Sequence, residues 1–252
     1  MKPIIEKIFW FILIILCTAC YRTIHEGTID NKDDYLLDYT GFTVQYNPNT
    51  RQPDWVSYTL TAEEVAMTEN TPKIPHNFME DTDLYEPQAS YEDYRGSGWS
   101  RGHMARHMDM KWNREAAQES DYMTNICPQN KKMNGGIWLK IENMARRLAT
   151  QYDSVNIVCG PIFTDTTNGT IGSNNIPVPD FFFKTFLVYY KGQYHSIAFI
   201  CPNDDVHTTP AAVATTVNQV EARIRTNLYC HLDDAIEETV EDELLPYYWG
   251  LN

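Results

Sequence analysis

The sequence predicts an α+β domain in which a central, mostly antiparallel sheet is flanked by helices. Residues 42–46 and 55–61 alternate apolar and polar side chains, as half-buried strands do. Residues 134–152 instead repeat apolar side chains at helical spacing. The later segments mix strand and helix patterns without a regular strand–helix–strand alternation, which disfavours a doubly wound parallel sheet.

The remaining elements follow from local patterns along the chain. Two proline-containing turn signals between the first two strands predict an antiparallel connection. Residues 66–98 are rich in Pro, Asp, Tyr and Gly and are predicted to form a long loop. Further strands are expected at 155–159, 182–190 and 194–201, and helices near 211–226 and 233–244.

The helix at 134–152 also presents a polar face. At about 100° per residue, Trp138, Glu142 and Arg146 follow Asn134 along one side, while Arg147 points to solvent. Asn134 is expected to cap the helix. The alternative is that these polar side chains are ordinary solvent-exposed helix residues, with Glu142 and Arg146 forming an i,i+4 ion pair. The core face is predicted from apolar residues at intervals of four, three and four: Ile137, Ile141, Met144 and Leu148.

Composition and charge restrict the classes of function. The 252 residues are 43% hydrophobic, which supports a packed core and excludes a disordered chain. A formal net charge of -14 argues against broad electrostatic adhesion to nucleic acid or to an anionic membrane. Residues 95–147, however, hold ten basic and five acidic side chains. An anionic ligand on this segment is one explanation, and a solvated mixed-charge face is the other.

The amino terminus is typical of an exported protein. Lys2 and Lys7 precede the apolar run 8–16, which has the length of a signal-peptide core. Thr18 and Ala19 lead directly into Cys20, a pattern that resembles a lipoprotein processing site and predicts a lipid anchor on Cys20. Plain secretion and an uncleaved anchor are the alternatives. The expected organisation is a signal peptide at 1–20, a tether at 21–40 and one extracytoplasmic domain at 41–252, on a membrane (periplasmic or cell-surface) or secreted.

Four cysteines remain for the folded domain. They are widely spaced and include no CxxC pair, so zinc ligation by this set has little support. An oxidising compartment allows disulfides in three pairings, and buried free thiols are equally consistent. The four residues are Cys127, Cys159, Cys201 and Cys230.

Three short motifs contain the residues that indicate a chemical function. Residues 100–103 read Ser-Arg-Gly-His, residues 124–129 read Thr-Asn-Ile-Cys-Pro-Gln, and residues 134–142 place Asn, Trp and Glu at positions 134, 138 and 142. This order resembles the signature of the DNA/RNA non-specific endonuclease family, the ββα-metal nucleases: D-R-G-H, then S-N-I-x-P-Q, then N-x-x-x-W-x-x-L-E. The resemblance extends over about 39–226. The main departure is Ser100, where the family usually has Asp, so a carboxylate that would support the histidine is absent there.

The resemblance implies a metal-dependent endonuclease that hydrolyses phosphodiester bonds of DNA, RNA or both with little sequence preference. His103 would be the general base, because a neutral imidazole can accept a proton from water near pH 7. Asn134 would be the direct protein ligand of Mg²⁺, with Mn²⁺ as a substitute, and Glu142 would act through water. The resemblance also allows a homodimer.

Further roles are implied for the cations and amides of the motifs. Arg101 and Arg146 would face the reacting phosphate, where a fixed fork of donors matches phosphate oxygens. Arg95 would contact an adjacent phosphate, and Trp138 would contact the substrate. Asn125 would position either the histidine loop or a substrate oxygen. His107 is expected to be structural, and five other histidines match no family position: His25, His76, His195, His207 and His231.

A second function class stays open on the sequence. The loss of the carboxylate at Ser100 and the acidic surface are compatible with a catalytically silent, extracytoplasmic nucleic-acid-binding module on the same fold. Retention of His103, Asn134, Glu142 and Arg146 favours the enzyme. The choice between DNA and RNA depends on loop geometry, which the sequence does not reveal.

Overall fold

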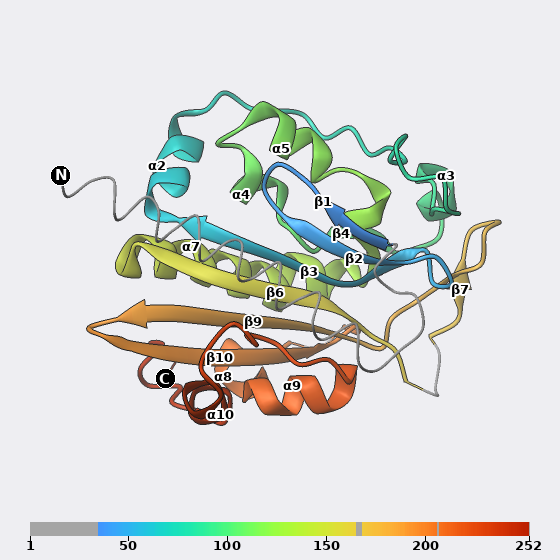
Figure 1. The fold of residues 1–252 in the computed structure, drawn as a ribbon. Helices are drawn as coiled ribbons and strands as arrows, with labels where there is room; N and C mark the ends of the chain where they lie inside the picture. The colour runs from blue at the N-terminus through green and yellow to red at the C-terminus, as the bar shows by residue number, and fades with distance from the viewer. Residues whose placement is uncertain (1–34, 165–167, 206, 252) are drawn as a thin grey trace.

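The computed structural model describes residues 35–164, 168–205 and 207–251. The expected signal peptide and most of the expected tether lie outside these ranges. Within them, one large sheet has the strand order β1-β2-β3-β6-β9-β10-β11, and every neighbouring pair is antiparallel (Figure 1). The predicted α+β class with a central antiparallel sheet is therefore confirmed. Its strands are β1 (Leu36–Asp38), β2 (Thr43–Asn47), β3 (Gln52–Thr61), β6 (Ser154–Ile162), β9 (Phe181–Tyr190), β10 (Gln193–Pro202) and β11 (Ala214–Thr215).

The hairpin between β9 and β10 shows how the sequence sets the register. Tyr190 pairs with Gln193, so the connection is the two-residue turn Lys191-Gly192. Both turn residues have positive φ, at 51° and 85°, as a type I′ hairpin turn requires. The glycine adopts this conformation without a steric penalty, and its backbone twist matches that of the paired strands.

The two faces of the sheet bury separate cores. Alternate side chains of a strand point to opposite faces, so Val56 and Trp55 of β3 belong to different hydrophobic clusters. One cluster packs under α7 (Leu139–Tyr152), and the other packs under α9 (Val217–Ile224) and α10 (Asp234–Glu241). In Figure 1, α9 and α10 lie beside β10, while α2, α4 and α5 gather on the other side of the molecule. The other helices are α2 (Ala62–Asn70), α3 (Tyr91–Tyr94), α4 (His107–Met110), α5 (Arg114–Glu119), α6 (Lys131–Met133) and α8 (Pro210–Val213).

The segment after β3 differs from the long loop expected at 66–98. Helix α2 continues to Asn70, and the short α3 lies near the end of the segment. Thr61 caps α2: its hydroxyl accepts from the Glu64 N–H, while the Glu64 side chain accepts from the Thr61 N–H. This capping box is a local signal that outweighs the weak apolar periodicity of the helix. The sheet also begins at Leu36, inside the stretch 21–40 that was expected to be a tether.

The motif-bearing helix begins earlier than expected. Asn130 caps α6, because its side-chain oxygen accepts from the backbone N–H groups of Lys132 and Met133. The expectation that Asn134 is the cap was therefore wrong, since Asn134 lies inside a continuous helical segment. Residues Asn134–Trp138 form a π-helical turn between α6 and α7. The i→i+5 bonds of such a turn accommodate one residue more than an α-helical turn does.

Three of the four domain cysteines are thiols and not disulfides. Cys127, Cys159 and Cys201 are buried free thiols, and burial raises the pKa of the Cys201 thiol to about 12. A thiol with so high a pKa is unreactive near neutral pH. Within the described ranges, no helix has the length and apolar character needed to cross a bilayer.

Helix α10 carries a buried carboxylate, Glu241, which should make the stability of the fold depend on pH. Glu241 is 3% exposed, and burial together with Glu221 and Glu237 raises its pKa to about 9. The folded state holds the proton of Glu241 more tightly than the unfolded chain does. The protonated Glu241 side chain therefore contributes its full stabilisation of the fold below about pH 4.5, and this contribution is lost as the pH rises to about 9. We expect Glu241→Gln to raise the Tm at pH 8 by about 2–4 °C, and by less at pH 5. Thermal unfolding at both pH values, with Glu238→Gln as an exposed control, checks this, and an equal shift at both pH values contradicts it.

Candidate active site

A small hairpin and the motif-bearing helix form the candidate site. Strand β4 (Ser100–His103) pairs antiparallel with β5 (Ile126–Gln129), so two of the three motifs are neighbours in space. A cavity of about 330 Å³ next to this hairpin is lined by His103, Asn134 and Glu142. Three cationic side chains share its wall: Lys73, Arg106 and Lys111.

The hairpin needs glycine at position 102. A Cβ there would lie 2.0 Å from Oε1 and 2.4 Å from Cγ of Gln129, a side chain that is fully buried. Because Gln129 has no room to retreat, only glycine lets β4 pass so close. Gly102 thereby fixes the position of the next residue, His103.

His103 is held by a carboxylate that the motif did not reveal. Its Nε2 lies 2.9 Å from Oδ1 of Asp121, which is 1% exposed. Burial lowers the pKa of His103 below its ordinary value, although the bond to Asp121 opposes this shift. Burial alone would raise the pKa of Asp121, but hydrogen bonds from three imidazoles hold it well below its usual range. A carboxylate therefore supports the histidine despite the loss at Ser100.

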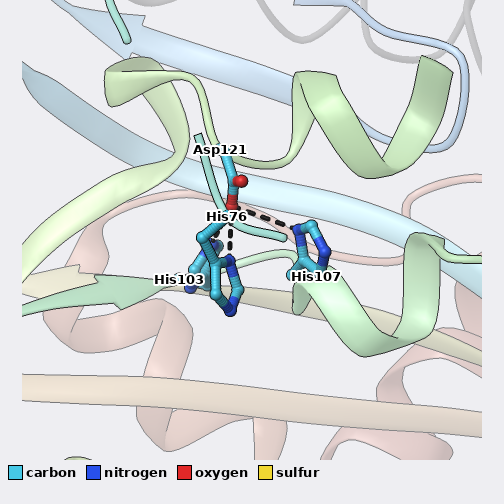
Figure 2. A group of neighbouring side chains, drawn as sticks. All are labelled: His76, His103, His107 and Asp121. Carbon is cyan, nitrogen blue, oxygen red and sulfur yellow. Dashed lines mark hydrogen bonds and ion pairs between the residues drawn. The ribbon is translucent and has the colours of Figure 1, made fainter. Parts of the chain in front are cut away.

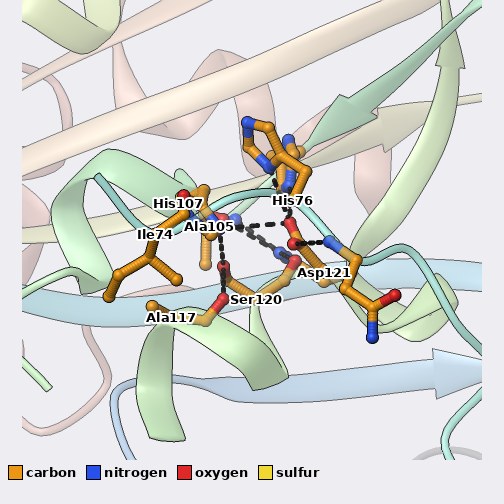
Figure 3. A network of polar contacts seen from close by, with 10 residues as sticks. Ile74, His76, Ala105, His107, Ala117, Ser120 and Asp121 are labelled. Carbon is orange, nitrogen blue, oxygen red and sulfur yellow. Dashed lines mark hydrogen bonds and ion pairs between the residues drawn. The ribbon is translucent and has the colours of Figure 1, made fainter. Parts of the chain in front are cut away.

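Asn125 ties the histidine loop to the segment that carries Asp121. It is fully buried, its Oδ1 accepts from the Ala105 N–H at 2.8 Å, and its Nδ2 donates to the carbonyls of Ala105 and Ser120. Figure 3 shows this polar network around Ser120 and Asp121. Of the two expected roles for Asn125, positioning of the loop fits these contacts, because no part of the side chain reaches the surface.

Asn134 and Glu142 bring oxygen donors to the same cavity. Burial raises the pKa of Glu142 to about 7, while the charges of Lys184 and Arg106 oppose the shift. The Arg106 Nε lies 3.3 Å from Glu142 Oε2, and its Nη1 donates to Asn143 Oδ1 at 2.9 Å. Arg106 could not be found from the motifs, because it falls between them and its partner Glu142 is 36 positions away.

Two residues of the predicted polar face lie elsewhere. Trp138 is fully buried in the main core, with its ring 5.7 Å from that of Phe182, which corrects the expected substrate contact. Arg146 donates to Asp109 Oδ1 at 3.1 Å and to Thr68 Oγ1 at 2.8 Å, and it does not line the cavity, so its expected phosphate contact stays a prediction. The π-helical turn rotates Asn134 relative to all later residues by about one position from an α-helical wheel, whereas Trp138, Glu142 and Arg146 keep α-helical spacing among themselves.

The other two predicted cations, Arg101 and Arg95, do not line the cavity. Arg101 is two residues before His103, on the same side of β4, and its guanidinium stacks over the rings of Phe78 at 4.9 Å and Tyr91 at 4.4 Å. Phe78 also lies 5.2 Å from the His103 ring, so it bridges the two residues. Arg95 is exposed and pairs with Glu92 at 3.4 Å.

Two further histidines surround Asp121. His76 and His107 each place Nδ1 against Asp121 Oδ1, at 2.9 and 3.1 Å (Figure 2). From the sequence, His76 matched no family position and His107 was expected to be structural. No motif joins these residues: His76 comes from the segment between α2 and α3, His107 begins α4, and Asp121 follows α5.

Comparisons with known proteins agree with this architecture. The family model described as DNA/RNA non-specific endonuclease matches residues 22–235. The mitochondrial nuclease EXOG of Xenopus laevis is 32% identical over 188 residues, which cover 67% of this chain and 50% of that protein. The mitochondrial endonuclease G of Homo sapiens is 30% identical over 182 residues, which cover 68% and 61%. The chain thus spans about half to three fifths of the length of these relatives.

A solved structure shares the fold. A chain in the crystal structure of an EndoG/EndoGI complex superposes with a TM-score of 0.75 at 23% identity, over 86% of this chain and 94% of that one. This likeness concerns the fold, whereas the match over residues 22–235 and the two relatives concern ancestry. Together with the motifs gathered around the cavity, they show that this chain belongs to the DNA/RNA non-specific endonuclease family.

Proposed function

We propose that this protein is a metal-dependent endonuclease that hydrolyses phosphodiester bonds of DNA, RNA or both with little sequence preference. One observation carries the proposal: His103, Asn134 and Glu142 line a single cavity together with three cationic side chains. A proton acceptor, oxygen ligands and positive charge are the groups that phosphodiester hydrolysis needs. Nucleases of this family are metal-dependent.

His103 would act as the general base. The ionised Asp121 carboxylate accepts the Nε2 proton, which leaves the lone pair of the neutral ring on Nδ1 to take a proton from the attacking water. The lowered pKa of His103 keeps the ring neutral at pH 7. Asp121 is then a positioning residue that fixes the tautomer and stabilises the ring once it is protonated.

Asn134 and Glu142 fit a magnesium ion. Both offer oxygen donors, which hard cations prefer, and among the described residues none forms a hydrogen bond with the Asn134 side chain. A bound Mg²⁺, or Mn²⁺ in its place, would neutralise charge that develops on the phosphoryl oxygens. Arg106 holds the Glu142 carboxylate in place, and Lys73 and Lys111 would attract the substrate backbone.

Cleavage of plasmid DNA and of structured RNA by the full chain, with Mg²⁺ or with EDTA, tests this proposal. We expect cleavage of at least one substrate with Mg²⁺ and none with EDTA, and the ratio of the two rates measures the preference for DNA or RNA. If the folded protein binds nucleic acid without cleaving it in Mg²⁺ or Mn²⁺, the silent binding module replaces the enzyme.

We also propose an extracytoplasmic location through a lipid anchor on Cys20. The support is the basic and apolar leader followed by Thr18-Ala19-Cys20. Replacing Cys20 with serine should move the protein from the membrane fraction of its host to the soluble or secreted fraction and abolish labelling by a fatty-acid analogue. Equal labelling of both forms contradicts the anchor.

The affinity for Mg²⁺ should depend on pH through Glu142. Because its pKa lies at about 7, the carboxylate is increasingly protonated as the pH falls below 7 and loses its attraction for a cation. We expect the Mg²⁺ concentration for half-maximal cleavage to rise about tenfold between pH 6.5 and pH 5.5. Glu142→Gln should require more Mg²⁺ at every pH, with little change across this range. An unchanged Mg²⁺ requirement for the wild type over this range would contradict the assignment.

A further inference from the structure

Four metal-ligating side chains converge at one side of the cavity. They are His76, His103, His107 and Asp121, and their ligand atoms all lie within 4.8 Å of one another. Figure 2 shows the three imidazole rings turned toward the Asp121 carboxylate. This group is distinct from the oxygen pair of Asn134 and Glu142, because it offers three nitrogens and one carboxylate.

The donor set selects a different class of ion from magnesium. Imidazole nitrogens suit Zn²⁺, Cu²⁺ and Ni²⁺, whereas Mg²⁺ prefers oxygen. A tetrahedral zinc site with bonds of about 2.0–2.1 Å places its ligands roughly 3.4 Å apart. The three imidazole nitrogens already lie 2.9, 2.9 and 3.1 Å from Asp121 Oδ1. Small side-chain rotations would therefore bring all four atoms to the required spacing.

The surroundings of the cluster orient its ligands. The second ring nitrogen of His107, Nε2, lies 3.2 Å from the Ile74 carbonyl, the kind of bond that fixes a metal-binding imidazole. The second carboxylate oxygen of Asp121, Oδ2, accepts from the Asn77 N–H at 2.6 Å, so Oδ1 is left for an ion. Ser120 Oγ lies 3.2 Å from His107 Nδ1 and would have to give up this contact.

An ion can reach the cluster from solvent. The His76 side chain is 51% exposed, and His76, His103 and His107 all line the cavity. His107 and Asp121 are buried and the His103 side chain is only 13% exposed; because the three come from separate segments of the fold, most of the site is assembled in advance. His76 then covers it from the segment between α2 and α3.

We propose that His76, His103, His107 and Asp121 bind a divalent ion of the zinc class, and that this binding silences the nuclease site. The second half rests on the proposed function of His103. When Nε2 of His103 coordinates the ion, the ring proton resides on Nδ1, and the ring has no lone pair left to accept a proton from water. The ion takes the place of the protons that now lie between the imidazoles and Asp121, and those protons move to the other ring nitrogens or to solvent.

Binding is measured without reference to cleavage. Isothermal titration of the full chain with Zn²⁺, and the visible absorption of the Co²⁺ form, are compared for the wild type, His76→Ala and His107→Ala. We expect the wild type to bind one equivalent more than either variant, or to bind it roughly 100-fold more tightly, with the intense absorption of tetrahedral Co²⁺. His195→Ala, in a histidine that contacts Glu243, is the matched control and should bind as the wild type does. His76→Ala removes a half-exposed side chain, so it provides a folded variant even if His107→Ala unfolds.

Silencing is measured as the Zn²⁺ dependence of cleavage at fixed Mg²⁺, relative to the zinc-free rate of each variant. We expect the wild type to lose at least about tenfold in rate at Zn²⁺ concentrations that leave His76→Ala unaffected. Equal zinc binding by the wild type and both variants overturns the site. Zinc binding at the cluster without loss of cleavage overturns the silencing. If the protein cleaves nothing under any condition, the proposed function fails, while the titration still decides the metal site.

Discussion

Replacing His103 with alanine is expected to slow cleavage of plasmid DNA and of RNA at least about 100-fold at saturating Mg²⁺. The variant loses the group that would accept the proton of the attacking water, while the oxygen pair and the cations of the cavity remain. The loss should therefore appear in kcat, with the Mg²⁺ dependence nearly unchanged. Initial rates over a range of Mg²⁺ concentrations separate the two parameters.

The pH profile gives a second measure of the same residue. Because burial lowers the pKa of His103, the acidic limb of kcat at saturating Mg²⁺ should have its midpoint below pH 6.5. His195→Ala serves as the matched control, since His195 also contacts a carboxylate but lies outside the cavity. A folded His103→Ala variant that keeps more than about a tenth of the wild-type kcat contradicts the general-base role.

Replacing Arg146 with alanine is expected to lower the free energy of unfolding by about 3–5 kcal/mol. Asp109 is fully buried, and its partners are Arg146 at 3.1 Å and the Tyr58 hydroxyl at 3.3 Å. Without the guanidinium, the buried carboxylate would keep only the Tyr58 hydroxyl as a hydrogen-bond partner, with the charges of Arg106 and Lys184 nearby, or would take up a proton at a cost in free energy. Urea unfolding followed by circular dichroism measures the change.

The same variant distinguishes the two roles considered for Arg146. A phosphate contact predicts a large loss of kcat in protein that is still folded, whereas the observed bond to Asp109 predicts a loss of stability with nearly normal kcat at low temperature. The double variant Arg146→Met with Asp109→Leu should recover much of the stability, because the charge and its partner are removed together. Arg95→Ala, in an exposed pair, should change stability by less than about 1 kcal/mol. If the double variant is less stable than Arg146→Ala, the buried pair is not the cause.

The sequence predicted the sheet better than the surroundings of the site. Each of β2, β3, β6, β9 and β10 was expected within a few residues of its observed bounds, because alternation and turn signals are local properties. The π-helical turn at Asn134–Trp138 was not predicted, since helical periodicity assumes a constant rotation per residue. That assumption misplaced Asn134 on the helical wheel, whereas the burial of Trp138 follows from its packing against Phe182.

The carboxylate partner of His103 was missed for a different reason. Motifs align residues that are close in the chain, but Asp121 reaches His103 through the packing of α4, α5 and the hairpin. Nothing in the pattern around Asp121 separates it from the other acidic residues of its helix end. Contacts of this kind follow from tertiary structure alone, as does the meeting of His76 with His107.

The π-helical turn makes the angle between the two oxygen donors depend on the number of residues in the turn. Removing one residue between Asn134 and Trp138 would convert the turn to regular α-helix and leave Asn134 at nearly its present angle to Glu142, because the wider turn fits one residue more into the same rotation. Inserting one residue would instead swing Asn134 by about 100° relative to Glu142, although every chemical group would still be present. A single-residue insertion in this turn is therefore a more severe lesion for an ion site than a single-residue deletion. In related chains, insertions within this turn should be rarer than single-residue deletions.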